Sequence, residues 1–226
     1  GETLPVVQVG AMDEIDYNNR GMTYNNLKLY DLALADCDEA IRLNPTLAEA
    51  YNNRGNNYND LGQHERAITD FDQAIHLNPS YAEAYNNRGI SYARLGQHER
   101  AIANFDQAIR LNPTFADTYN NRGNSYAGLR QHLRAIADYD QAIRLNPDLA
   151  KAYYNRGNRY AGLGQHERAI ADFDEAIRLN PSYADAYNNR GNSYAKLGQT
   201  ERAIADYDQA IRLNPSYADA WFNKGS

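Results

Sequence analysis

The chain has 226 residues with a formal net charge of -6 at pH 7, and 42% of its residues are hydrophobic. This acidic balance argues against a nucleic-acid-binding surface, which needs a basic face to neutralise phosphates, and no apolar run approaches the roughly 18 residues that a membrane-spanning helix requires. The single cysteine, Cys37, cannot form an internal disulfide, which is compatible with a reducing compartment and favours the cytoplasm.

Residues 1–13 stand apart from the rest of the chain. The segment from Gly1 to Met12 contains Pro5 and a short β-branched stretch, but it lacks the charged start and long apolar run of a signal peptide. Two interpretations are open. The segment is either a remnant of an expression tag, ending at Gly10-Ala11-Met12, or an extended arm that could serve as a groove ligand for a neighbouring molecule.

From residue 14 onwards one unit of 34 residues returns, and Asn-Pro marks its period. The dipeptide occurs at Asn44-Pro45, Asn78-Pro79, Asn112-Pro113, Asn146-Pro147, Asn180-Pro181 and Asn214-Pro215. Such a period predicts an array of stacked supersecondary units with one continuous core. We number the units repeats 1 to 6, at 14–47, 48–81, 82–115, 116–149, 150–183 and 184–217. A partial seventh unit follows at 218–226, so we expect a fragment of a longer array.

Each unit contains two helical patterns. In repeat 2 the first runs from about Ala48 to Leu61, and the second begins near His64 and ends at Pro79, which has no amide hydrogen to donate. Two helices joined by a short turn form an antiparallel hairpin. Glycine closes this turn in four repeats, where a left-handed conformation carries no steric cost. Lys28 and Arg130 replace it in repeats 1 and 4, so we expect those two turns to be strained or differently shaped.

The second helix of each unit carries an apolar stripe with a spacing of three and four residues, which predicts its core-facing side. An aromatic residue fills the middle of this stripe in five repeats, and Cys37 takes that place in repeat 1. We therefore interpret Cys37 as a buried filler rather than a nucleophile. Arg54 and its equivalents fall among tyrosines on the packed side of the first helix, and a buried guanidinium needs partners. Asp70 and Asp72 offer two parallel carboxylate series for a structural ladder.

Repeat 3 distinguishes between these two series. It has Asn104 where the first series has aspartate. If that series supplies the partner, Arg88 should lack its salt bridge while the other arginines keep theirs.

Together these motifs resemble the tetratricopeptide repeat. The order Ala-Tyr-Asn-Asn-Arg-Gly-Asn-x-Tyr, Leu-Gly-Gln-His-Glu-Arg-Ala-Ile, Phe-Asp-Gln-Ala-Ile and Asn-Pro recurs over residues 14–226. The resemblance implies an all-α superhelix, or solenoid, of antiparallel helix pairs. It also implies that the first helices line a concave surface that usually receives a peptide or a partner's extended segment. The arginine of Asn-Asn-Arg-Gly departs from the family, which often has leucine there.

A helical wheel places the polar side of the first helix away from its tyrosines. Because the aromatic side must face the core, we expect the asparagine side to face solvent or a ligand. A carboxamide offers donors and an acceptor, which suits an extended peptide backbone. One asparagine never changes: Asn19, Asn53, Asn87, Asn121, Asn155, Asn189 and Asn223. The preceding position reads Asn52, Asn86, Asn120, Tyr154 and Asn188 from repeat 2 onwards. The alternative is that these residues cap or bridge adjacent helices, or reflect duplication of one ancestral unit.

Other positions on the same side vary, and we expect them to set specificity. One series is mostly acidic and would suit a basic partner segment: Ile15, Glu49, Glu83, Asp117, Lys151, Asp185 and Asp219. Another has apolar members that could accept anchor side chains: Met22, Asn56, Ile90, Asn124, Asn158 and Asn192. The alternative for the acidic series is a solvated helix face.

Catalytic chemistry is not indicated. His64, His98, His132 and His166 occur once per unit, and packed helices lie about 10 Å apart, whereas zinc ligands must converge at about 2 Å. No phosphate loop or nucleophile motif is present in the sequence, so we expect neither enzyme activity, metal nor cofactor. Three functions remain open: a peptide-binding scaffold; an array that associates end to end through Asp219, Trp221 and Phe222; and the substrate-recruiting arm of a larger enzyme.

Overall fold

The computed structural model describes residues 12–225, so the two interpretations of residues 1–11 lie outside it. Over this range the chain forms thirteen α-helices joined by short turns, without strands. The first helices of the repeats are α1 (Glu14–Asn26), α3 (Ala48–Asp60), α5 (Ala82–Arg94), α7 (Ala116–Gly128), α9 (Ala150–Gly162) and α11 (Ala184–Lys196), followed by α13 (Ala218–Gly225). The second helices are α2 (Tyr30–Leu43), α4 (His64–Leu77), α6 (His98–Leu111), α8 (His132–Leu145), α10 (His166–Leu179) and α12 (Thr200–Leu213).

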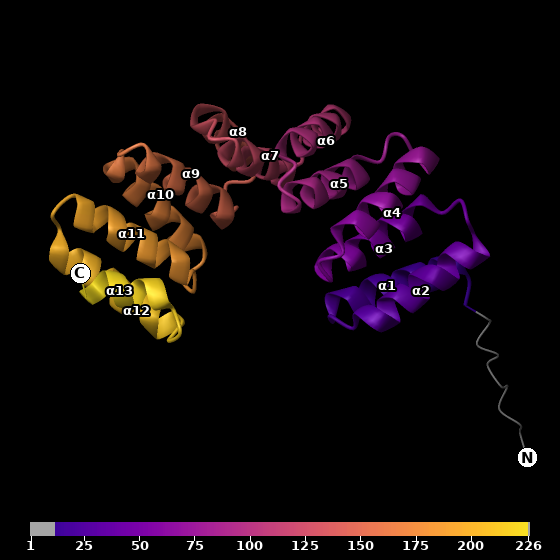
Figure 1. Ribbon diagram of the computed structural model, residues 1–226, viewed down its shortest axis with the longest axis horizontal. Coiled ribbons are helices and arrows are strands. Elements are labelled where there is room, and N and C mark those ends of the chain that lie inside the picture. Colours follow the sequence, from indigo (N-terminus) through magenta and orange to yellow (C-terminus); the bar gives the residue numbers. More distant parts are fainter. Residues whose placement is uncertain (1–11, 226) are drawn as a thin grey trace, which may run out of the picture. The chain divides into compact units, whose positions relative to one another are not determined.

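The helices belong to two compact bodies (Figure 1). Among the described residues, the N-terminal body runs to Leu111 and contains α1 to α6, and the C-terminal body begins at Asn112 and contains α7 to α13. Within each body every first helix packs on the second helix of its own repeat, and that second helix packs on the next first helix. Successive first helices also touch, as α1 touches α3 and α7 touches α9. The expected all-α fold of stacked helix pairs is confirmed.

Asparagine and proline at the repeat boundary end each second helix. Asn78 is the C-cap of α4, and its backbone amide donates to the Ala74 carbonyl. Its side-chain Oδ1 then accepts from the backbone amide of Ser80 at 3.1 Å, which turns the chain toward α5. Since Pro79 cannot donate a backbone hydrogen bond, the helix cannot continue through it. The Asn-Pro dipeptide that marks the period of the sequence is therefore the point at which each second helix ends.

All six turns inside the repeats have one conformation. Gly62 has φ 73°, its amide donates to Asn59, and the following amide donates to Tyr58, which is a Schellman ending. Lys28 and Arg130 adopt φ 60° and 59° with the equivalent hydrogen bonds. The expectation of a different shape at these two turns is therefore wrong, because the backbone bonds impose the same path. The expected strain is present, since the backbone of both residues lies in the left-handed region, which is sterically unfavourable for a residue with a Cβ atom.

The core depends on a close approach between glycine and an aromatic ring. Phe71 is fully buried against Gly55, where an added Cβ would lie 2.7 Å from a ring carbon. In repeat 1 the smaller Cys37 takes the place of the ring, and a Cβ on Gly21 would lie 3.3 Å from its sulfur. Cys37 is fully buried, and desolvation raises the pKa of its thiol to about 12. Its interpretation as a core filler is confirmed.

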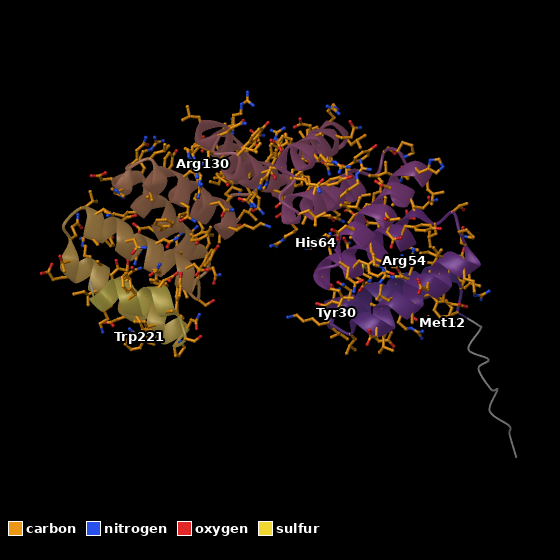
Figure 2. The ribbon with its side chains drawn as sticks, viewed as in Figure 1. Met12, Tyr30, Arg54, His64, Arg130 and Trp221 are labelled. Atoms are coloured by element: carbon orange, nitrogen blue, oxygen red, sulfur yellow. The ribbon has the colours of Figure 1, made fainter. Side chains whose placement is uncertain are left out.

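The arginines of Asn-Asn-Arg-Gly form the expected ladder. Arg54 donates two hydrogen bonds, from Nε and Nη2, to the carboxylate of Asp70 in its own repeat, at 2.8 and 2.7 Å. Its Nη1 donates to Asp38 of the preceding repeat at 2.7 Å (Figure 2 labels Arg54). Both carboxylate series are therefore partners. The expectation that Arg88 would lack a salt bridge, if the Asp70 series supplied the partner, needs correction. Arg88 donates to Asn104 at 2.7 Å and keeps a salt bridge to Asp72 of the second series at 2.5 Å.

The strained turns generate a prediction about stability. Lys28→Gly and Arg130→Gly should each raise the free energy of unfolding by about 0.5–1 kcal/mol, since glycine removes the left-handed penalty but loosens the unfolded chain. The reciprocal change Gly62→Lys should lower the free energy of unfolding by a similar amount. Urea denaturation measures all three. A neutral or destabilising Lys28→Gly would show that the turn carries no strain.

Repeat 3 supplies a reference for the arginine ladder. The Asp70 side chain is only 6% exposed, so Asp70→Ala should lower the free energy of unfolding by about 2–3 kcal/mol by leaving part of Arg54 without a partner. Asp70→Asn should cost about 1 kcal/mol, because Asn104 shows that an amide oxygen can accept from the same arginine. Equal losses in the two variants, measured by denaturant titration, would contradict this account.

Candidate functional site

The asparagine that occurs in every repeat connects neighbouring first helices. In the N-terminal body Asn53 Nδ2 donates to Asn18 Oδ1 at 2.8 Å, and Asn87 Nδ2 donates to Asn52 Oδ1 at 3.1 Å. In the C-terminal body Asn155 donates to Asn120 at 3.0 Å. Each such side chain is therefore held by the repeat before it. The bridging role left open by the sequence is present in the structure.

The acceptors in this ladder lie beneath the surface. Asn52, Asn86, Asn120 and Asn188 are at most 4% exposed. The exposure expected for these four asparagines is wrong. For Asn52, Asn120 and Asn188 the next first helix of the same body packs over that edge of the helix, whereas the wheel treats each helix alone. In the ladder a buried asparagine accepts a hydrogen bond from the surface asparagine of the next repeat, as Asn188 accepts from Asn223 at 3.1 Å.

The donors of the ladder remain at the surface. Asn53, Asn87, Asn121, Asn155 and Asn189 are half-buried and Asn19 is exposed. Each carboxamide has two N–H donors and one oxygen acceptor, and the repeat-to-repeat bond uses one N–H. The oxygens of Asn87 and Asn189 also accept from the buried asparagine beside them, at 3.2 and 3.1 Å. Asn53, Asn87 and Asn155 are thus oriented by the protein and keep a second N–H beyond the bond to the preceding repeat, whereas Asn189 donates to both Tyr154 and Asn158.

In a further asparagine series on the first helices, two members accept hydrogen bonds from tyrosines of the second helices. Asn124 and Asn192 accept from the hydroxyls of Tyr139 and Tyr207 at 2.8 and 2.9 Å. In repeat 5, where Phe173 has no hydroxyl, Asn158 accepts instead from Asn189 at 2.8 Å. The sequence signal for this pairing was the exchange of Phe for Tyr in the second helix. Asn56 is half-buried on α3.

The charged series differs between the two bodies. Glu49 and Glu83 are exposed on α3 and α5 of the N-terminal body. In the C-terminal body Lys151 forms a salt bridge of 2.5 Å with Asp117, while Asp185 stays exposed. The acidic character that could attract a basic ligand is therefore retained in the N-terminal body and partly neutralised in the other.

Aromatic residues just before the first helices also belong to this surface, and the sequence reasoning did not include them. Tyr81 is half-buried, and burial together with Glu83 and Glu49 raises its pKa to about 12. In the C-terminal body the Tyr154 ring lies 4.7 Å from that of Tyr183, centroid to centroid, and its hydroxyl accepts from Asn189 at 3.1 Å. The available signal was an apolar or aromatic residue two positions after every Asn-Pro.

The side chains of this surface offer amides, carboxylates and aromatic rings. The described part of the chain contains no group of three or more His, Cys, Asp and Glu placed to hold a metal ion. His64 Nδ1 lies 3.0 Å from Asn59 Oδ1, so this histidine is part of the packing between two helices. None of the helices between residues 12 and 225 is long and apolar enough to cross a membrane.

Solved structures with a similar fold include three that span most of this chain. YrrB, a TPR protein with an unusual peptide-binding site, is 28% identical with a TM-score of 0.65, covering 84% of this chain and 98% of that one. MamA is 26% identical with a TM-score of 0.65, covering 73% and 96%. PilW, a type IV pilus biogenesis factor, is 22% identical with a TM-score of 0.84, covering 92% and 97%, and shows the fold alone. No curated protein matches.

Family models agree with this fold. A tetratricopeptide repeat model matches residues 16–47, 82–115, 116–149 and 184–217, together more than half of the chain. A second tetratricopeptide repeat model matches 37–69 and 138–171, and a TPR repeat model matches 55–96 and 157–198. The fold is consistent with a protein-interaction scaffold, and the chain belongs to the tetratricopeptide repeat family.

Proposed function

We propose that the polar surface of the first helices binds an extended segment of a partner protein. The observation that carries the proposal is the asparagine series from Asn19 to Asn189, whose members repeat at the same place in successive repeats. The preceding repeat orients Asn53, Asn87 and Asn155 by a hydrogen bond. Side chains that are already ordered lose little conformational entropy on binding. Their remaining donors and acceptors can pair with a peptide main chain of any sequence.

The residues around this series would choose among partners. Glu49 and Glu83 favour a basic segment on the N-terminal body, and Met22, which is 49% exposed, offers an apolar contact there. On the C-terminal body the rings of Tyr154 and Tyr183 favour an apolar or aromatic anchor. The 28% identity to YrrB, whose structure has a peptide-binding site, supports the same class of ligand.

End-to-end association is the second candidate. Trp221 and Phe222 on α13 are 54% and 75% exposed, which is unusual for large aromatic side chains. Light scattering over a range of protein concentrations separates the two candidates. A mass that increases with concentration and depends on these aromatic residues, without peptide binding, would favour association. The third possibility, the recruiting arm of a larger enzyme, depends on sequence beyond this chain.

The asparagine proposal is tested with a pair of matched variants. Asn53→Ala with Asn87→Ala removes the exposed amides, whereas Asn18→Ala with Asn52→Ala breaks the same two hydrogen bonds from the buried side. On an array of unrelated extended peptides the first variant should lose about 30-fold in affinity for most binders, because it removes two hydrogen bonds with a net worth of about 1 kcal/mol each. The second should lose stability but keep most binding. Unchanged binding in the first variant would show that these asparagines only bridge adjacent helices and do not contact the peptide.

The charge proposal has its own readout. Glu49→Gln with Glu83→Gln should slow the association of lysine-rich peptides and reduce the effect of salt on the association rate, since exposed charges act mainly through long-range attraction. Asp185→Gln in the C-terminal body is the matched control. Surface plasmon resonance at two ionic strengths measures the rates. An equal effect of Asp185→Gln would show that the charge acts through the whole protein rather than through this edge.

A further inference from the structure

A second surface lies in the C-terminal body, at the turn between α7 and α8 (Figure 2 labels Arg130 there). This turn borders a cavity of about 530 Å³, here named the repeat 4 turn pocket. Its lining consists of Arg130, Gln131, His132, Leu133, Arg134 and Leu163. The lining contains two guanidinium groups, two leucines and no carboxylate. In a chain of net charge -6, such a composition is a local exception.

Comparison with the other repeats shows how the pocket arose. The residue that follows the first position of the second helix is acidic in every other repeat: Asp31, Glu65, Glu99, Glu167 and Glu201. In repeat 4 it is Leu133, which is 79% exposed, and α8 has no acidic residue in its first turn. A helix N-terminus carries partial positive charge, which an acidic residue in the first turn normally offsets. The start of α8 therefore combines an exposed leucine with an uncompensated positive end.

Both arginines of the pocket are exposed. Arg130 occupies the left-handed turn position at φ 59°, although four other repeats place glycine there. The Arg134 guanidinium carbon lies 5.7 Å from the Tyr126 ring centre, whereas its equivalent Arg66 lies 4.1 Å from Tyr58 and donates to the Tyr58 hydroxyl at 2.8 Å. Arg134 donates instead to Gln131 Oε1 at 3.1 Å, within the pocket lining. Its wider distance from the ring is shared with Arg202, which lies 5.4 Å from Tyr194.

A related pocket in repeat 1 serves as an internal comparison. It has a volume of about 340 Å³ and its lining includes Lys28, Tyr30 and Leu61 at the equivalent positions. It keeps the acidic residue Asp31 at the place of Leu133. Its charges are therefore mixed, whereas the charged residues that line the repeat 4 turn pocket are arginines.

We propose that the repeat 4 turn pocket docks an acidic, apolar segment of a partner protein. The carboxylates of that segment meet Arg130, Arg134 and the start of α8, and a leucine or phenylalanine side chain covers Leu133 and Leu163. Charge complementarity argues for this occupant, since the lining offers cations and apolar surface together. The site lies on the turn side of the helix pair, so it does not depend on the asparagine surface or on what that surface binds.

The test uses three sets of synthetic octapeptides and the 226-residue protein. One set places two carboxylates beside a central leucine or phenylalanine, the second replaces the carboxylates with lysine, and the third replaces the apolar residue with serine. Fluorescence polarisation of the unchanged protein and of Leu133→Glu isolates the binding that depends on the pocket. That part of the binding should be at least tenfold stronger for the first set than for the other two. A loss of lysine-set binding in Leu133→Glu equal to the loss of first-set binding would overturn the proposal.

Two variants restore what the other repeats contain, so neither should disturb the fold. Leu133→Glu returns the acidic residue, and Arg130→Gly returns the turn glycine. Each should weaken binding of the first set at least tenfold, and Arg130→Gly should do so while the melting temperature rises. Lys28→Gly, which relieves the same strain in repeat 1, should leave the binding that depends on the pocket unchanged.

Two further results would contradict the proposed docking of a partner segment in the pocket. Unchanged affinity in Leu133→Glu and Arg130→Gly would show that the acidic peptides bind elsewhere. If light scattering finds a dimer that Leu133→Glu dissociates, the pocket is occupied by a second copy of this chain and the proposal of a partner segment is wrong.

Discussion

Every other feature of this protein depends on the contact between one repeat and the next. A pair of helices of 13 and 14 residues has too little interior to fold alone, so its stability must come from its neighbours. Apolar packing supplies the core, but polar residues fix the spacing and register of the stack. Arg54 connects its own second helix to the preceding one, and Asn53 connects its first helix to the preceding first helix. Both residue types occur in all six full repeats.

This constraint explains how much the sequence could predict. Helix ends, turns and the buried ring follow from local rules, since Pro79 stops a helix and Gly62 reverses the chain whatever surrounds them. The arginine ladder was also predictable, because a guanidinium on a packed helix face requires carboxylates. Local rules did not predict that Arg88 would keep a partner, because that partner, Asp72, comes from the adjacent repeat.

The candidate site was predicted less completely for the same reason. A helical wheel considers one helix, and so it placed Asn52 and Asn53 together on the open side. In the stack the neighbouring first helix covers Asn52, which is 3% exposed, and leaves Asn53 at the edge. The aromatic residues before the first helices, such as Tyr81, escaped notice because their closeness to Glu49 arises only when two repeats pack.

Two kinds of surface emerge from this arrangement. The asparagine series is a by-product of stacking that keeps unused hydrogen-bonding groups, and it recurs because the stack recurs. The repeat 4 turn pocket has the opposite origin, since its carboxylate-free lining is present where Arg130 and Leu133 depart from the pattern of the other repeats. We propose the first surface for a partner's main chain and the second for particular side chains.

The central claim is that the exposed asparagine amides contact a bound peptide while the buried ones only support them. The most direct measurement follows the side-chain amide resonances of a ¹⁵N-labelled sample during titration with a peptide binder. The account predicts large shifts for Asn53, Asn87 or Asn155 and small shifts for the buried Asn52 and Asn120. Peptide binding that leaves the Asn53 series unmoved would contradict it.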